Sequence, residues 1–295
     1  MDFKLAQESI SNLLEKNLFF VFGYPKSGTT WLQHLLNGHP EIACVGESLF
    51  TRLMPLLESA ADKYNKQVAE INEVRLQNKV YPKLTQDHVD SLLVTAIALM
   101  LGDMTNNTSV KCVGDKTPEY FKDSELFARL FPKAKFIHVI RDGRDVSISG
   151  WFQNLRLYGD KYRKRYPDLY SYINESAAYE WIEGIKEGRK FKQTHPNGYL
   201  ELKYEDLHIN PESTVMSMLR FLEVDPSDEM VQKCLDAGAF SKLSKGREKG
   251  EENRKSFFRK GTSGDWKNHY DQKCLDAFMH HAGDMIRELG YEEGF

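Results

Sequence analysis

The sequence has few cysteines and lacks any long apolar run. Its cysteines are Cys44, Cys112, Cys234 and Cys274. They are widely separated and form no C-x-x-C pair, which argues against a zinc knuckle or a disulfide framework and predicts reduced, mostly buried thiols. The longest apolar run, residues 92–101, is interrupted only by Thr95 and is well short of the roughly 20 residues that span a bilayer. We therefore expect no transmembrane helix.

The sequence also lacks an excess of charge of one sign. Lys and Arg total 40 against 43 Asp and Glu, a net charge of -3. This balance excludes the broad basic field of a nucleic-acid-binding protein, so any anion site must be local. Residues 1–16 scatter acidic and polar side chains where an export signal needs an unbroken apolar stretch. We expect a cytoplasmic protein with neither a nucleic-acid nor a membrane partner.

The chain has 295 residues, of which 41% are hydrophobic, enough for a sizeable core. Short apolar runs alternate with stretches of helical periodicity, which predicts an α/β fold with an open central parallel sheet flanked by helices. No linker separates two cores, so residues 1–295 are expected to form a single domain. Charged residues and glycine dominate 242–260, which predicts a surface loop. The expected strands are residues 18–22, 42–45, 110–113, 136–140 and 199–202.

A phosphate-binding loop follows the first expected strand. Residues 23–30 lie between a strand and a helix, where backbone N–H groups and the helix dipole can hold a multiply charged anion. The nucleoside-triphosphatase motif G-x-x-x-x-G-K-[ST] requires Lys directly after its second glycine. This chain has Thr29 at that position and places Lys26 inside the loop, so the usual Mg²⁺-bridged triphosphate geometry is not expected.

This loop resembles that of the sulfotransferases that use 3'-phosphoadenosine 5'-phosphosulfate (PAPS) and release 3'-phosphoadenosine 5'-phosphate (PAP). Residues 25–31 read P-K-S-G-T-T-W, the first nucleotide motif of that family. The resemblance implies that the loop and its hydroxyls hold the 5'-phosphate, that Lys26 contacts the bridging oxygen, and that Trp31 packs on adenine. The 5'-phosphate ligands implied are Ser27, Gly28, Thr29 and Thr30.

Two further segments resemble the family's 3'-phosphate motifs. Arg141 follows the fourth expected strand, and Ser149 lies eight residues later, with the spacing of the second motif. A guanidinium at a strand end can donate two parallel hydrogen bonds to a phosphate. Alone, this segment is weak evidence, because Asp142 and Arg144 within it are equally consistent with a surface ion pair. Residues 259–268 match the third motif, R-K-G-x-x-G-D-W-K, and by resemblance bring Arg259, Lys260 and Gly261 to the 3'-phosphate.

Adenine contacts are implied at Tyr204, in Y-E-D-L, and at Phe240, in A-F-S, although both residues are equally consistent with core packing. The resemblance extends from about residue 18 to residue 268. It implies in-line sulfuryl transfer to a hydroxyl, or less favourably an amine, of a small-molecule acceptor. Lys26 would stabilise the leaving oxygen, and no metal is required.

The general base is the least determined part of the site. The cytosolic small-molecule branch takes it from a K-T-H motif, but here residues 114–118 read G-D-K-T-P and contain no histidine. In this respect the chain is closer to bacterial and polysaccharide-type members. Glu47 resembles the glutamate base of other branches and is the first candidate. An equally weighted alternative is that Glu47 is only a structural acid at the start of a helix. Asp115 is the second candidate, and Lys116 is expected to orient the sulfuryl group.

The acceptor site is less specified. Aromatic residues crowd 151–179, where they either line an acceptor pocket or pack amphipathic helices on the sheet. The segment 242–258 is a candidate lid that orders when the donor binds. Two other functions compete with sulfuryl transfer: a phosphate-loop kinase using ATP and Mg²⁺, and a nucleotide-binding module without turnover. The sequence does not specify the oligomeric state.

Overall fold

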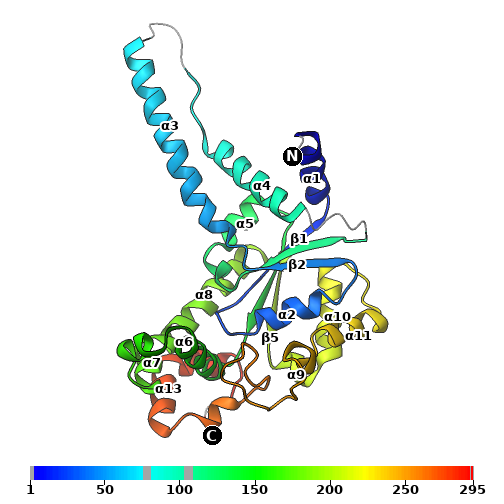
Figure 1. The fold of residues 1–295 in the computed structure, drawn as a ribbon, viewed down its shortest axis with the longest axis vertical. Coiled ribbons are helices and arrows are strands. Elements are labelled where there is room, and N and C mark those ends of the chain that lie inside the picture. The colour runs from blue at the N-terminus through cyan, green and yellow to red at the C-terminus, as the bar shows by residue number, and fades with distance from the viewer. Residues whose placement is uncertain (1–2, 76–80, 103–108, 293, 295) are drawn as a thin grey trace.

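A five-stranded parallel sheet forms the centre of the molecule (Figure 1). The computed structural model describes residues 3–75, 81–102, 109–292 and 294. The strands are β1 (Asn17–Phe22), β2 (Ile42–Gly46), β3 (Cys112–Lys116), β4 (Lys135–Ile140) and β5 (Tyr199–Lys203). Their order is β2-β3-β1-β4-β5, and each neighbouring pair is parallel. This confirms the predicted open parallel sheet.

Helices cover both faces of the sheet. Those of the N-terminal half are α1 (Phe3–Leu14), α2 (Thr29–Leu36), α3 (Leu53–Arg75), α4 (Gln86–Gly102), α5 (Ser124–Leu130) and α6 (Gly143–Arg165). Those that follow are α7 (Leu169–Tyr172), α8 (Ala178–Thr194), α9 (Asp206–Ile209), α10 (Pro211–Leu222), α11 (Asp228–Ala237), α12 (Phe240–Leu243) and α13 (Gln272–Glu288). Short helical turns are η1 (Phe50–Arg52), η3 (Pro118–Lys122), η4 (Ile173–Ala177), η5 (Pro196–Gly198) and η6 (Asp265–Asn268).

The alternation of side chains along β1 divides the core into two layers. Phe20 and Phe22 point to the face that α4, α5 and α8 help to cover. Phe19 and Val21 point to the opposite face, against α2, α10 and α11. Because β1 is central and apolar on both faces, it is buried along almost its whole length, as expected for a parallel sheet covered on both sides.

The third strand differs from its predicted position. The sequence predicted it at 110–113, but β3 runs from Cys112 to Lys116. Its last three residues are Gly114, Asp115 and Lys116, which carry no apolar signal, although all of them are buried. The prediction ended where hydrophobicity ended, whereas the backbone continues to pair with β1 and β2 as far as Lys116.

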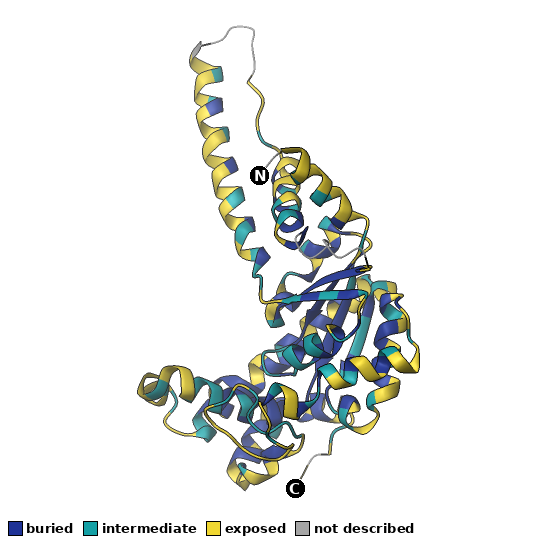
Figure 2. Cartoon of the chain, turned by 45° about the vertical axis from the view of Figure 1, so that its right-hand side comes forward, coloured by how far each residue is buried: buried dark blue, intermediate teal, exposed yellow. Residues whose placement is uncertain are grey.

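The connection between β2 and β3 projects from the body. α3 is 23 residues long and extends away from the sheet, and α4 returns beside α1 (Figures 1 and 2). None of the described helices is long and apolar enough to cross a membrane. All four cysteines are buried free thiols, as predicted. After α12, residues 244–264 lack regular structure and are mostly exposed or half-buried, which agrees with the predicted surface loop.

Candidate active site

All five strands end at one edge of the sheet, and each contributes to a common cavity or its wall. The loop after β1 holds Lys26, Arg141 follows β4 and Tyr204 follows β5. At the other side, Glu47 follows β2 and Lys116 is the last residue of β3. Ligands in open parallel sheets bind outside the carboxyl ends of the strands, at the point where the strand order reverses. Here the order reverses at β1, which precedes the predicted phosphate loop.

The phosphate loop has a backbone that only a few residue types adopt easily. Gly28 precedes α2 with φ +102°, and a Cβ added there would lie 2.4 Å from Cδ2 of Tyr204. Glycine is therefore needed both for its left-handed conformation and for the close approach of the tyrosine ring. Thr29 and Thr30 form the first turn of α2, where backbone N–H groups have no partners within the helix.

Two groups contact the ammonium of Lys26. Its Nζ hydrogen-bonds Oε1 of Gln153 on α6 and lies 4.3 Å from the centre of the Phe257 ring. Burial, together with the positive charge of Arg141, lowers the pKa of Lys26 to about 8. An ammonium with such a pKa is weakly solvated, so an anionic oxygen placed beside it would be strongly stabilised.

Arg141 and the third motif are joined through Asp145, a residue that the sequence analysis did not identify. The guanidinium of Arg141 donates to the carbonyl oxygen of Thr262 at 3.0 Å and lies 3.5 Å from Asp145 Oδ2. The carboxylate of Asp145 is 1% exposed and accepts backbone N–H groups of Gly264 at 2.7 Å and Trp266 at 2.9 Å. Burial raises the pKa of Asp145. This carboxylate therefore positions the two predicted 3'-phosphate segments relative to each other.

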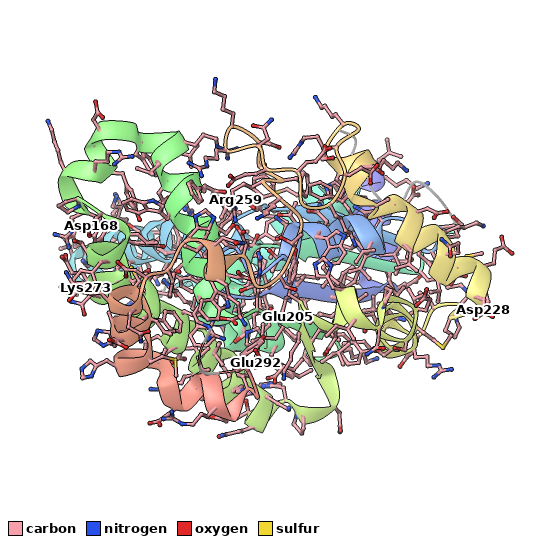
Figure 3. All side chains as sticks on the ribbon, turned by 90° about the horizontal axis from the view of Figure 1, so that it is seen from below. Asp168, Glu205, Asp228, Arg259, Lys273 and Glu292 are labelled. Carbon is pink, nitrogen blue, oxygen red and sulfur yellow. The ribbon has the colours of Figure 1, made fainter. Side chains whose placement is uncertain are left out.

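The cations of the third motif are paired with acids. Asp265 accepts hydrogen bonds from Arg259 and Lys260, each at 2.5 Å. Burial opposes ionisation of Asp265, but these hydrogen bonds outweigh it and hold its pKa well below the usual range. The other edge of Arg259 donates to Glu252 at 2.6 Å. Seen from below, Arg259 lies between α6 and α11 (Figure 3).

Aromatic rings surround the part of the cavity predicted for adenine. Trp31 lies 5.3 Å from Tyr204 between ring centres and 4.8 Å from His208, and its Nε1 donates to the carbonyl oxygen of Gly238. His208, on α9, was missed by the sequence analysis. Burial lowers its pKa to about 4, so the imidazole is neutral at pH 7, and its buried Nε2 has no hydrogen-bond partner among the described residues.

The two candidate bases occupy different environments. Glu47 lines the cavity, and its Oε1 accepts a hydrogen bond from Lys116 Nζ at 2.8 Å. The same ammonium also donates to Thr30 Oγ1 at 3.2 Å. Asp115 is fully buried and does not line the cavity. Its carboxylate accepts from Ser48 Oγ at 2.7 Å and from Thr117 Oγ1 at 2.9 Å. Asp115 therefore fixes the strand ends around the site, whereas only Glu47 faces the space that a substrate would occupy.

The cavity has a volume of about 360 Å³, within the range of small-molecule sites. Ser27, Asp115 and Lys116 are buried beneath its wall. The other predicted site residues line it: Lys26, Gly28, Thr29, Thr30, Trp31, Glu47, Arg141, Ser149, Tyr204, Phe240, Arg259, Lys260 and Gly261. Leu49, Arg52, Thr117, Pro118 and Glu119 extend the wall beyond Glu47.

The aromatic stretch after the second motif packs internally. Trp151 and Tyr172 form a small cluster with Ala177, against which Tyr162 and Tyr166 pack. None of these residues lines the cavity. The packing interpretation therefore holds for these residues, whereas the Phe152 ring lies 4.9 Å from the Arg259 guanidinium. Asp142 and Arg144 do form an ion pair, at 2.7 Å, but it is buried rather than on the surface. Among the described residues, no cluster of His, Cys, Asp or Glu is suited to a metal ion.

Comparison with known proteins identifies the relatives of this chain. The profile described as the Sulfotransferase family matches residues 19–228. Protein-tyrosine sulfotransferase 2 of Gallus gallus is 26% identical over 289 residues, covering 94% of this chain and 70% of the relative. Sulfotransferase 1E1 of Bos taurus is 26% identical over 279 residues, covering 89% and 81%.

A solved structure shares the fold. The crystal structure of mouse sulfotransferase SULT7A1, complexed with PAP, superposes with a TM-score of 0.55 at 16% identity. The superposition covers 95% of this chain and 89% of the mouse chain. The family and fold predicted from the sequence are thus confirmed. The chain belongs to the sulfotransferase family, and the reaction of this enzyme is sulfuryl transfer.

Proposed function

We propose that this enzyme transfers the sulfuryl group of PAPS to a hydroxyl, or less favourably an amine, of a small-molecule acceptor, and releases PAP. The observation that carries the proposal is the convergence of three distant segments on one cavity. The phosphate loop, the link between β4 and α6, and residues 259–261 supply Lys26, Arg141 and Arg259 to the same space. A ligand with anionic groups at both ends of an adenosine would need cations in this arrangement.

The two ends of the donor fit different parts of the cavity. We place the 5'-phosphosulfate at the phosphate loop and α2, and the 3'-phosphate between Arg141, Ser149 and Arg259. The adenine would lie among Trp31, Tyr204 and Phe240, where apolar rings replace water. The PAP described for the mouse structural neighbour is consistent with this donor.

In the proposed reaction, the acceptor oxygen attacks sulfur in line with the departing bridging oxygen. A new sulfur–oxygen bond forms as the bond to the bridging oxygen breaks. Glu47 takes the acceptor proton, and Lys26 hydrogen-bonds the oxygen that leaves with the bisphosphate. Lys116, with its ammonium between Glu47 and Thr30 beneath the cavity wall, holds the base beside the phosphate loop.

The competing functions make different demands on the same residues. A kinase would need a lysine at position 29 to reach the β- and γ-phosphates, where this chain has threonine. A binding module without turnover would need no base at the cavity, yet Glu47 lines it beside the loop. Both features support sulfuryl transfer. The buried free thiols are consistent with a reducing compartment, and we propose a cytoplasmic location.

Titration calorimetry with PAP, AMP and ATP plus Mg²⁺ tests the donor. We expect PAP to bind most tightly, because only PAP presents phosphate to Arg141 and Arg259. Arg141→Ala should weaken PAP binding and leave AMP binding nearly unchanged. Arg163→Ala removes an exposed arginine of α6, the helix that follows Arg141, and serves as the control. Tightest binding of ATP with Mg²⁺ would instead establish a kinase-like site.

Mass spectrometry of an acceptor panel incubated with PAPS tests turnover and the acceptor. The panel should contain phenols, alcohols, amines and a tyrosine peptide, because the Gallus gallus relative is a protein-tyrosine sulfotransferase. We expect transfer to a small hydroxyl compound, and we expect Glu47→Gln to abolish it while PAP still binds. Tight PAP binding without transfer to any acceptor would favour the non-catalytic module. Transfer to the peptide alone would reject the small-molecule assignment.

A further inference from the structure

α3 carries an apolar stripe that the rest of the described chain covers only in part: Leu57 packs on the core, and the Tyr64 hydroxyl donates to the carbonyl oxygen of Pro82 at 3.4 Å. Leu57, Ala60, Tyr64, Gln67, Ile71 and Val74 recur at alternating spacings of three and four residues. This is the heptad pattern of a helix that packs lengthwise on another helix. Tyr64 is 43% exposed, Ile71 38% and Val74 82%, so much of the stripe faces solvent. Gln67, near its centre, is the one polar member.

The stripe adjoins the face that α3 uses within its own chain, and the two overlap only at Leu57. Met54, Ala61 and Val68 are buried, seven residues apart. Beside them, Asn65 exchanges two hydrogen bonds of 2.8 Å with the backbone of Leu84. The intramolecular face is therefore occupied by the segment that returns toward α4. Figures 1 and 2 both show α3 extending from the body, with its outer side open.

We propose that this stripe is the interface for a second copy of the chain, with two α3 helices packed antiparallel about a two-fold axis. The helices would match in three kinds of layer: Leu57 against Val74, Ala60 against Ile71, and Tyr64 against Gln67. Each layer occurs twice, as an isologous interface requires. From residue 57 to residue 74 the stripe is about 26 Å long.

Charge complementarity indicates that the stripe binds a second copy of this chain rather than a membrane surface. Lys63 and Glu70 are exposed, seven residues apart, on the flank of the stripe that faces away from the buried side. In the antiparallel arrangement that aligns the apolar layers, Lys63 of each helix lies beside Glu70 of the other. A parallel pair would instead place Lys63 beside Val68 of the other helix and leave it without an acidic partner. Helices that lie on membranes are rich in Lys and Arg, whereas α3 also carries Glu58, Asp62, Glu70 and Glu73.

Lys66 and Glu73 provide a matched control. They have the same two charges and the same spacing on the same helix, and both are exposed, but they lie on the side opposite the stripe. Reversing either one changes the net charge of α3 as much as reversing Lys63 or Glu70. Because Lys66 and Glu73 lie outside the interface, their reversal should not affect association.

Sedimentation velocity of the full chain over a hundredfold range of concentration tests the proposal. We expect a concentration-dependent dimer that Ile71→Lys abolishes. Lys63→Glu or Glu70→Lys should each weaken association about tenfold, because both inter-helix pairs become repulsive. A mixture of these two variants should dimerise again, since every pair between unlike chains is then attractive. Lys66→Glu should associate like the unaltered protein.

The proposal is overturned if the unaltered protein remains monomeric throughout the concentration range. It is also overturned if Ile71→Lys still dimerises, which would place the interface elsewhere. Failure of the mixed variants to pair would exclude the antiparallel register. Circular dichroism and melting temperature check that each variant is folded. Since Ile71 and the charged residues are exposed, we expect little change in either. The inference does not depend on the identity of the donor or the acceptor.

Discussion

Replacing Gly28 with alanine should damage donor binding through Tyr204. At φ +102° the residue is in a region that disfavours a Cβ, and that Cβ would lie 2.4 Å from Cδ2 and 2.8 Å from Cε2 of the tyrosine ring. Ordinary carbon contacts begin near 3.4 Å, so the ring or the loop must move by about 1 Å. Tyr204 is 6% exposed and cannot yield without disturbing its neighbours.

Those neighbours are the residues proposed to bind the donor. The Tyr204 ring packs 4.2 Å from the guanidinium carbon of Arg141 and edge-on against Trp31. In enzymes, a misplacement of about 1 Å in positioning groups can cost about a hundredfold in rate, and we expect PAP affinity to fall by up to that factor. The left-handed backbone at residue 28 should also lower the folding stability of Gly28→Ala by about 1–2 kcal/mol. For a chain of this size that corresponds to a fall in melting temperature of a few degrees.

Gly250→Ala separates these two effects. Gly250 has φ +98°, nearly the same as Gly28, but a Cβ there would meet no atom of the described residues within 4 Å. Calorimetric titration with PAP and thermal unfolding should be measured for both variants. We expect both to lose some stability and only Gly28→Ala to lose PAP affinity. If Gly28→Ala binds PAP within about twofold of the unaltered protein, Tyr204 does not link the loop to Arg141 and the reasoning fails.

Three further perturbations address the charged groups of the site. Because the pKa of Lys26 is about 8, PAP affinity should decline as the pH rises through that value and the ammonium loses its proton. Calorimetry of Lys26→Met should show no such decline, and a decline that persists in this variant would mean that another group titrates. Asp115→Asn should lower folding stability by about 2 kcal/mol, since it disturbs buried hydrogen bonds; thermal unfolding measures this, and loss of transfer with unchanged stability would restore Asp115 as a candidate base. Glu252→Gln should tighten PAP binding a few-fold, because Glu252 competes with phosphate for Arg259; calorimetry that finds weaker binding would mean that Glu252 positions the arginine.

The parts of the site that could be predicted are those in which one short segment performs one task. Residues 25–31 are contiguous, so the chain itself brings Lys26, Gly28 and the two threonines to one cavity. Arg141 was assigned by resemblance to the family's second motif, and its place at the cavity follows because strand ends meet at one edge of the sheet. Local patterns of this kind are visible in the order of residues.

Contacts between distant segments could not be predicted. Asp145 bonds residues that are 119 and 121 positions later in the chain, and no periodicity or spacing indicates that it does so. Composition also failed to distinguish Glu47 from Asp115, since both are carboxylates near the end of a strand. The fold separates them, because Asp115 lies in the buried part of β3 and Glu47 lies beyond the end of β2.

The cations proposed for the donor are already paired with acids of the protein. Asp145 lies beside Arg141, Asp265 binds both Arg259 and Lys260, and Glu252 takes the other edge of Arg259. Without such acids, several buried positive charges would repel one another across the cavity at a large cost in stability. The acids therefore allow the site to exist before the donor binds. Part of the attraction between the cations and a phosphate must then be used to displace or share these partners. The buried Asp145 is held by two backbone N–H groups and must remain in place, whereas Glu252 lies in the exposed loop and is the partner that a phosphate can displace.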